Sequence, residues 1–216
     1  MKNLLIVLAL VIFTSCQDNY IILDQTSNIS FQLFDENGEG IENTSIKIDS
    51  KLYSYYSITD ENGVAEFLDF VQGEYFYDIE FNDPTTGMDY YLYKPFMVTA
   101  EYDKNFEFHA IDLKKDLTLH VKDQYNNIIA NADVSIITGN AFNELFPDTS
   151  EIINNTIQTN SANSIGEVVF EQVPLNEYNG YRAIVKDLND KIYFTSYQLY
   201  VDRDLDNEYT IRIQVY

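Results

Sequence analysis

The sequence predicts an all-β protein made of two tandem, seven-stranded antiparallel β-sandwiches behind an N-terminal signal peptide. Three observations support this prediction. Apolar and polar residues alternate along many short segments, as in half-buried strands. Asn-Gly and Asn-Asn pairs separate these segments, where hairpin turns need residues that tolerate a positive φ. The second half of the chain also repeats the first, which indicates a duplicated structural unit.

The first element is a predicted signal peptide, residues 1–15. Lys2 precedes ten consecutive apolar residues, 4–13, about half of what a helix needs to span a bilayer. A short apolar run behind a basic residue is typical of a cleaved export signal. Phe13-Thr14-Ser15-Cys16 resembles the lipobox of bacterial lipoproteins, which implies a lipid on Cys16 and cleavage before it. An ordinary secretory signal followed by a coincidental cysteine is the alternative.

Residues 16–27 are a predicted tether between this cysteine and the first strand. Fully extended, residues 17–27 reach at most about 35 to 40 Å. The apolar stretch 20–23 offers an alternative, in which part of the tether pairs as an extra strand.

The repeat defines the two sandwich domains. The matched pairs are Asp35/Asp123, Ile41/Ile129 and Ile46/Val134 at an offset of 88, and Gly63/Gly166, Phe67/Phe170 and Phe106/Tyr209 at an offset of 103. The jump between offsets places a fifteen-residue insertion in the second copy. We therefore predict domains at 28–113 and 114–216, with an inserted loop at about 139–160. We expect two separate cores in a stiff tandem, because only residues 114–116 connect the two units.

The stretch Thr59-Asp60-Glu61-Asn62-Gly63-Val64-Ala65-Glu66-Phe67 resembles the T-D-x-x-G-x-x-x-F pattern of carboxypeptidase regulatory-like (transthyretin-like) domains. The second copy keeps Gly166 and Phe170 but has Asn176 where that family favours glycine. The resemblance implies an Ig-like sandwich. It also implies a scaffold or binding module, since such domains are mostly non-catalytic.

The composition excludes several classes of function. The chain has 35 acidic and 13 basic residues, for a net charge of −22, and this charge would repel both the phosphates of nucleic acids and anionic lipid headgroups. One cysteine and two histidines leave little for a zinc or copper site. We expect no cofactor and no catalytic residues, because no nucleophile-base pattern stands out and carboxylate pairs arise by chance in so acidic a chain.

One loop has the spacing of calcium ligands. Asp202, Asp204 and Asp206 alternate as the oxygen ligands of calcium loops do. The twelfth position of this loop is Ile213, where the helix-flanked calcium loop has a glutamate. The alternative is a polar hairpin between the last two strands.

Tyrosines offer a candidate binding surface. Tyr53, Tyr55, Tyr91 and Tyr93 belong to aromatic groups in which neighbouring residues face opposite sides of a strand. At least one ring in each group must point away from its own core. Such a ring can stack on a sugar or pack against a partner domain. The alternative is that tyrosine serves here only as a good strand former.

The insertion 139–160 is the first-choice binding site. It carries Phe142, Leu145 and Phe146 in an otherwise Asn-, Thr- and Ser-rich segment. Long loops on a rigid scaffold often carry recognition residues. The alternative is a lid that covers the edge of its own sheet.

Together these features predict a lipid-anchored outer-membrane lipoprotein of a Gram-negative cell envelope, facing either the periplasm or the outside. Its expected role is non-catalytic adhesion, assembly or scaffolding. The predicted partners are a membrane, through lipid on Cys16, and an envelope protein or glycan. The alternatives are an accessory carbohydrate-binding lipoprotein, using the tyrosines or the 139–160 loop, and a fimbrial-type subunit.

Overall fold

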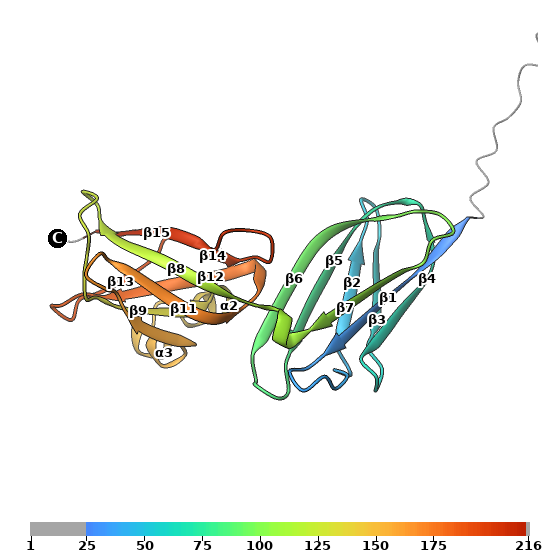
Figure 1. Ribbon diagram of the computed structural model, residues 1–216, viewed down its shortest axis with the longest axis horizontal. Helices are drawn as coiled ribbons and strands as arrows, with labels where there is room; N and C mark the ends of the chain where they lie inside the picture. Colours follow the sequence, from blue (N-terminus) through green and yellow to red (C-terminus); the bar gives the residue numbers. More distant parts are fainter. Residues whose placement is uncertain (1–24, 215–216) are drawn as a thin grey trace, which may run out of the picture.

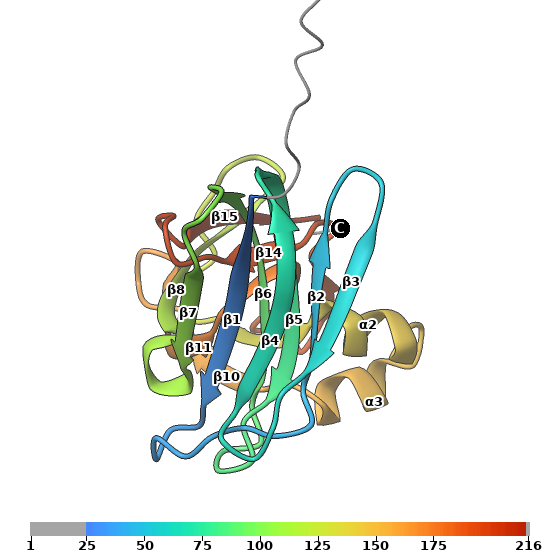
Figure 2. The same ribbon diagram turned by 90° about the vertical axis from the view of Figure 1, so that its right-hand side faces the viewer.

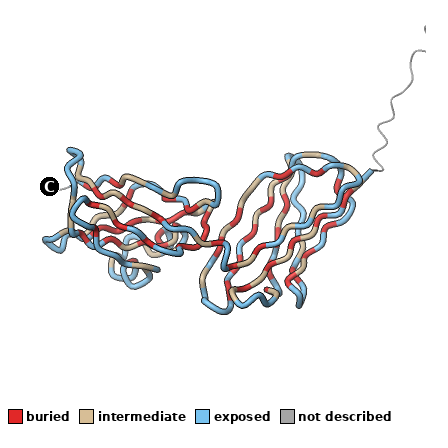
Figure 3. The backbone as a smooth tube through the Cα atoms, viewed as in Figure 1, coloured by how far each residue is buried: buried red, intermediate tan, exposed pale blue. Residues whose placement is uncertain are grey.

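Two β-sandwiches lie end to end in the computed structural model, which describes residues 25–214 (Figure 1). The predicted all-β fold class is confirmed. Strands β1–β7 form the first sandwich and strands β8–β15 the second. Buried positions alternate with exposed or half-buried ones along most strands, as the period-two pattern of the sequence requires (Figure 3).

The first sandwich is followed by a short 3-10 helix, and the insertion of the second contributes two helices and a strand. The elements of the first sandwich are β1 (Thr26–Phe34), β2 (Ser45–Asp49), β3 (Ser54–Ile58), β4 (Val64–Val71), β5 (Gly73–Asn82), β6 (Asp89–Val98), β7 (Lys104–His109) and η1 (Ala110–Asp112). Those of the second are β8 (Lys114–Asp123), β9 (Asp133–Thr138), α2 (Gly139–Leu145), α3 (Thr149–Asn154), β10 (Gln158–Ser161), β11 (Glu167–Pro174), β12 (Asn176–Lys186), β13 (Ile192–Phe194), β14 (Leu199–Val201) and β15 (Glu208–Ile213).

Both sandwiches use the same pairing around their first strand. In the first, β1 lies between β4 and β7; in the second, β8 lies between β11 and β15. Phe31 pairs with Phe106, and Leu119 pairs with Tyr209, so the pairing register agrees with the offsets of 88 and 103. The outer pairs β1/β7 and β8/β15 are parallel, which differs from the purely antiparallel expectation. In each sandwich, the first and last strands run in the same direction.

The inserted segment differs from the expected loop. It forms α2, α3 and the edge strand β10, so the second sandwich has eight strands rather than seven. Thr138 caps α2 by accepting a hydrogen bond from the Ala141 N–H, and Asp148 caps α3 by accepting from the N–H groups of Ser150 and Glu151. Both helices have fewer than two turns, too short to show a helical period in the sequence.

The first strand begins two residues earlier than predicted. Thr26 and Ser27 are part of β1, because they pair with Val71 and Phe70 of β4. The Ser27 hydroxyl also donates to the Thr99 carbonyl (2.8 Å), which ties the strand to the β6–β7 turn. The predicted signal peptide, Cys16 and the tether up to residue 24 lie outside the described residues.

The two sandwiches share a continuous sheet and core, which differs from the expected two separate cores. Strand β12 of the second sandwich pairs in parallel with β6 of the first, at Asn176 and Tyr91. Buried apolar side chains of both sandwiches belong to one connected cluster, which includes Leu113 and Leu175 where the sandwiches meet. We call this region, where residues 90–94 and 110–114 contact residues 174–178 and 202–204, the junction.

Candidate functional site

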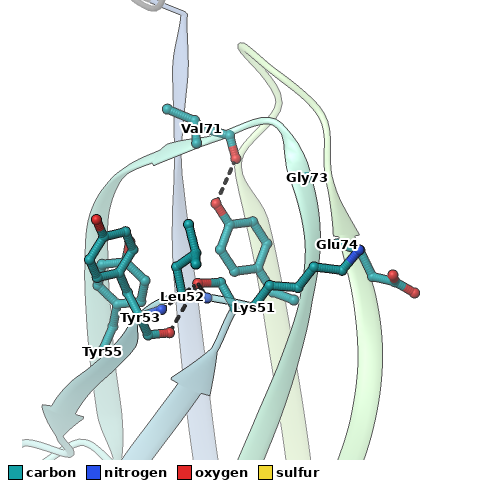
Figure 4. A pocket seen from close by; sticks show the side chains of 9 residues that line it. Lys51, Leu52, Tyr53, Tyr55, Val71, Gly73 and Glu74 are labelled. Carbon is teal, nitrogen blue, oxygen red and sulfur yellow. Dashed lines mark hydrogen bonds between the residues drawn. The ribbon is translucent and has the colours of Figure 1, made fainter.

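A solvent-open groove of about 400 Å³ lies at the end of the first sandwich where β1 begins (Figure 4). The β2–β3 turn, residues 50–53, forms one side, and the end of β4 with the start of β5, residues 71–75, forms the other. Its lining includes Lys51, Leu52, Tyr53, Val71 and Glu74. The groove thus offers apolar surface, tyrosine hydroxyl groups and one charge of each sign. Such a lining can bind a ligand through van der Waals contacts and hydrogen bonds.

Local hydrogen bonds set the shape of this groove. The Ser50 N–H donates to the Tyr53 carbonyl (2.8 Å), and the Tyr53 N–H donates to the Ser50 hydroxyl oxygen (3.0 Å), which closes the β2–β3 turn. Leu52 is therefore held at the apex, 81% exposed. On the other side, the buried Tyr75 donates its hydroxyl to the Val71 carbonyl (3.1 Å), and burial raises the pKa of Tyr75.

The predicted tyrosines separate into two places. Tyr53 and Tyr55 line the groove, but the Tyr55 ring packs on Phe70 with ring centroids 4.7 Å apart. Tyr53 is thus the more exposed of the pair, at 65%. Tyr91 and Tyr93 lie instead at the junction.

At the junction, both tyrosines pack against Tyr178 of the second sandwich. The ring centroids lie 6.3 Å apart for Tyr91 and 5.5 Å for Tyr93. The Tyr91 hydroxyl donates to Glu80 (2.5 Å), and burial together with this hydrogen bond raises the pKa of Tyr91 to about 12. The sequence left open whether such rings stack on a sugar or pack against a partner domain. Tyr91 and Tyr93 pack against the second sandwich.

The apolar residues of the insertion mostly pack inward. Phe142 is buried, and with Ile137, Ile152 and Ile184 it forms a small second core. Leu145 is half-buried against this core, whereas Phe146 is exposed. Phe142 therefore cannot serve as an exposed anchor, and the insertion resembles the alternative, a lid over its own sheet. Only Phe146 of the three remains open to a partner.

The aspartates of the 202–206 loop bind a lysine. The Lys94 ammonium lies 3.0 Å from Asp202 Oδ1, 2.6 Å from Asp204 Oδ2 and 3.4 Å from Glu177 Oε1. Although burial disfavours its charge, the hydrogen bonds to Asp204 and Asp202 raise the pKa of Lys94. Asp206 is exposed. Across residues 25–214 no cluster of histidine, cysteine and acidic side chains could hold a metal ion.

Sequence reasoning missed the partners at the junction. The Tyr93 N–H donates to Glu177 Oε2 (3.0 Å), and burial raises the pKa of Glu177. Leu175 links the two sandwiches through main-chain bonds, accepting from the Tyr91 N–H (3.0 Å) and donating to the Leu113 carbonyl (2.8 Å). Lys114 forms an ion pair with Glu36 of the first sandwich. In the sequence, only the short connection at residues 114–116 indicated that the two sandwiches are held firmly together.

Comparisons with known proteins give distant similarities. No protein-family model and no curated protein matches the chain. Among solved structures, it is similar to the Bacillus anthracis TIE protein (13% identity, TM-score 0.38), covering 88% of this chain and 34% of that one. It is also similar to BcpA, the major pilin subunit of Bacillus cereus (6%, TM-score 0.35, covering 88% and 99%). A third is GBS52, the minor pilin of Streptococcus agalactiae (10%, TM-score 0.33, covering 88% and 94%).

This chain spans about a third of the TIE protein and 62% of a streptococcal ancillary pilin. The TM-scores are all below 0.5, so these similarities assign no function to the chain. Between residues 25 and 214 no helix is long and apolar enough to cross a bilayer.

Proposed function

We propose that this chain is a stiff, non-catalytic module, held at a bacterial envelope membrane by lipid on Cys16, that spaces or assembles other envelope components. The junction carries the proposal. Main-chain bonds, the Lys94 ion pairs and a shared apolar core all link the two sandwiches, as a rod-like spacer requires. Interdomain contacts of this kind oppose the relative motion that is the default between domains.

The anchor is tested by cell fractionation. We expect the full chain to sediment with membranes and its Cys16→Ala variant to appear in the soluble fraction, because the lipid is the proposed means of attachment. Equal partitioning of the two proteins would rule out the anchor.

The stiffness is tested by a distance measurement. The Cys16→Ala chain has no cysteine, so Tyr56→Cys and Tyr125→Cys can carry two spin labels, one on each sandwich, at exposed positions. We expect a narrow distribution of interlabel distances, broadened by Lys94→Met. A broad distribution in the chain with Lys94 intact would show that the sandwiches move independently and would overturn the spacer role.

Carbohydrate binding is a second candidate, supported by the exposed Tyr53 ring beside the groove. This candidate rests on Tyr53, because Tyr91 and Tyr93 pack against Tyr178 and Phe142 is buried. A glycan array probed with the Cys16→Ala chain tests it, with Tyr53→Ala as the control. A fimbrial-type subunit would need a free sheet edge for a second copy, and β3 lies at such an edge.

A further inference from the structure

Exposed apolar side chains gather on three turns at one end of the molecule. Leu52 and Tyr53 lie on the β2–β3 turn, and Val71 lies at the end of β4. Met97 and Tyr102, 54% and 70% exposed, flank the β6–β7 turn. We call these five residues the tip. Isolated apolar residues on a surface are ordinary, but a group on neighbouring turns indicates contact with something apolar.

The strand registers place the whole tip around the start of β1. Thr26 pairs with Val71, and Glu74 at the start of β5 pairs with Met97. The Tyr102 N–H donates to the Ser27 hydroxyl oxygen (3.1 Å). The β2–β3 turn and the start of β1 lie at the same end of the sandwich (Figure 2). The tip therefore surrounds the point where the described chain begins.

The length of chain between Cys16 and the start of β1 limits how far the tip can lie from a lipid on Cys16. Eight residues, 17–24, separate Cys16 from Gln25. Even fully extended, they span only about 30 Å. A lipid on Cys16 would therefore keep the start of β1, and the tip around it, within about 30 Å of the bilayer surface. The opposite end of the molecule, where β8 and β15 end, would point away from it.

The chemistry of the tip suits the headgroup layer of a bilayer. Tyrosines combine an apolar ring with a polar hydroxyl and favour the membrane-water interface. Lys51 lies beside Leu52 on the same turn. Two nearby acids form hydrogen bonds within the fold: Glu101 accepts from the Gln25 side chain (3.0 Å), and Asp103 accepts from the Asn28 N–H (2.6 Å). A third, Glu74, is exposed beside Met97.

We propose that the tip rests in the headgroup region of a lipid bilayer, so that the two-sandwich rod stands on the membrane instead of swinging from its tether. This inference rests on the proposed lipid anchor at Cys16. The anchor holds the chain near the bilayer, and the tip sets its orientation there.

Fluorescence of the lipidated full-length protein in phosphatidylcholine vesicles tests the inference. Lipid blocks the thiol of the only native cysteine, so an introduced cysteine can carry an environment-sensitive dye. Leu52→Cys reports on the tip, and Tyr125→Cys, on the turn after β8, is the matched control at the opposite end. We expect a blue shift at residue 52 and loss of its fluorescence when the lipid headgroups carry a nitroxide. We expect neither change at residue 125.

The outcomes separate the anchor from the docking. If the protein fails to float with the vesicles, the anchor itself is refuted, and the inference falls with it. If the protein floats but the label at residue 52 is quenched no more than that at residue 125, the docking alone is refuted. A blue shift without quenching would mean that protein, not lipid, covers the tip, which also overturns the inference.

A second variant checks that the tip residues cause the docking. Tyr102→Asn should reduce quenching at residue 52 while the protein still floats. Leu188→Asn, at a 74% exposed site in the second sandwich, should leave the quenching unchanged. Equal effects of the two substitutions would contradict the proposal.

Discussion

Replacing Lys94 with methionine should lower the free energy of unfolding by more than the loss of a single exposed ion pair would. The substitution keeps most of the apolar stem but removes the charge that faces Glu177, Asp202 and Asp204. The Glu177 side chain is only 3% exposed, so its carboxylate would lose its cation in a place that water scarcely reaches.

The magnitude follows from this burial. Breaking a buried pair costs about 3 to 5 kcal/mol, and breaking an exposed pair about 0 to 1 kcal/mol. Lys94 is 24% exposed and Asp204 is 69% exposed, so we expect an intermediate loss of about 2 to 3 kcal/mol in the free energy of unfolding. Lys186→Met is the control, because Lys186 pairs with the largely exposed Asp190. We expect it to leave the free energy of unfolding almost unchanged.

Urea unfolding followed by tyrosine fluorescence measures both variants, since the chain has no tryptophan. Adding Glu177→Gln to Lys94→Met should recover part of the loss, because the amide carries no charge that needs a partner. The reasoning fails if Lys94→Met is as mild as Lys186→Met, or if the second substitution makes the protein less stable still.

Three further predictions concern turns and the insertion. Gly63 and Gly38 both have positive φ (+76° and +83°), but a Cβ on Gly63 would lie 2.3 Å from a backbone oxygen of β1, whereas one on Gly38 meets nothing within 4 Å. Gly38→Ala should therefore cost about 1 to 2 kcal/mol in urea unfolding and Gly63→Ala distinctly more; equal costs would contradict this. Hydrogen bonds from the Thr85 hydroxyl and, to a smaller extent, from backbone N–H groups lower the pKa of Asp35. The ionised Asp35 carboxylate therefore stabilises the fold above its unfolded pKa of about 3.9, and this stabilisation is lost as pH falls through the lower folded pKa. Asp35→Asn should lower the urea midpoint at pH 7 and reduce its fall between pH 7 and pH 3. Phe142→Ala should cost about 3 kcal/mol, whereas Phe146→Ala, at a 59% exposed position, should cost less than about 1 kcal/mol, and a reversed order would refute the assignment of Phe142 to a core.

The sequence predicted those parts of the fold that depend on local pattern and on duplication. Period-two alternation gave the strands of both sandwiches, and matched residues such as Phe31 and Leu119 occupy equivalent positions. The glycine pair Gly63 and Gly166 also matched correctly, with φ of +76° and +75°. A turn position that requires a positive φ can be recognised in the sequence, because glycine is the residue that adopts this φ most readily.

The parts that depend on contacts between distant residues could not be predicted. Lys94 lies 83 residues before Glu177 in the sequence, and neither belongs to a local motif. The tip combines residues from three turns, so nothing in a sequence window marks it. The start of β1 gave a different error: Thr26 and Ser27 resemble a polar linker, and their strand conformation depends on pairing with Val71 and Phe70 of the distant β4.

The large acidic excess has a structural explanation in the turns. Each of Asp35, Asp60, Asp123 and Asp187 accepts backbone N–H bonds from residues two and four positions later, and hydrogen bonding lowers the pKa of each carboxyl.

The four side chains stabilise the turns that follow β1, β3, β8 and β12, in a chain with only eight glycines. At the junction Lys94 and Lys114 offset part of the acidic charge. Near the tip, Glu101 and Asp103 accept hydrogen bonds from Gln25 and Asn28. Removing acidic residues to test whether charge governs membrane contact would therefore also open turns, and such a test should change Glu66 or Glu107 on exposed strand faces instead.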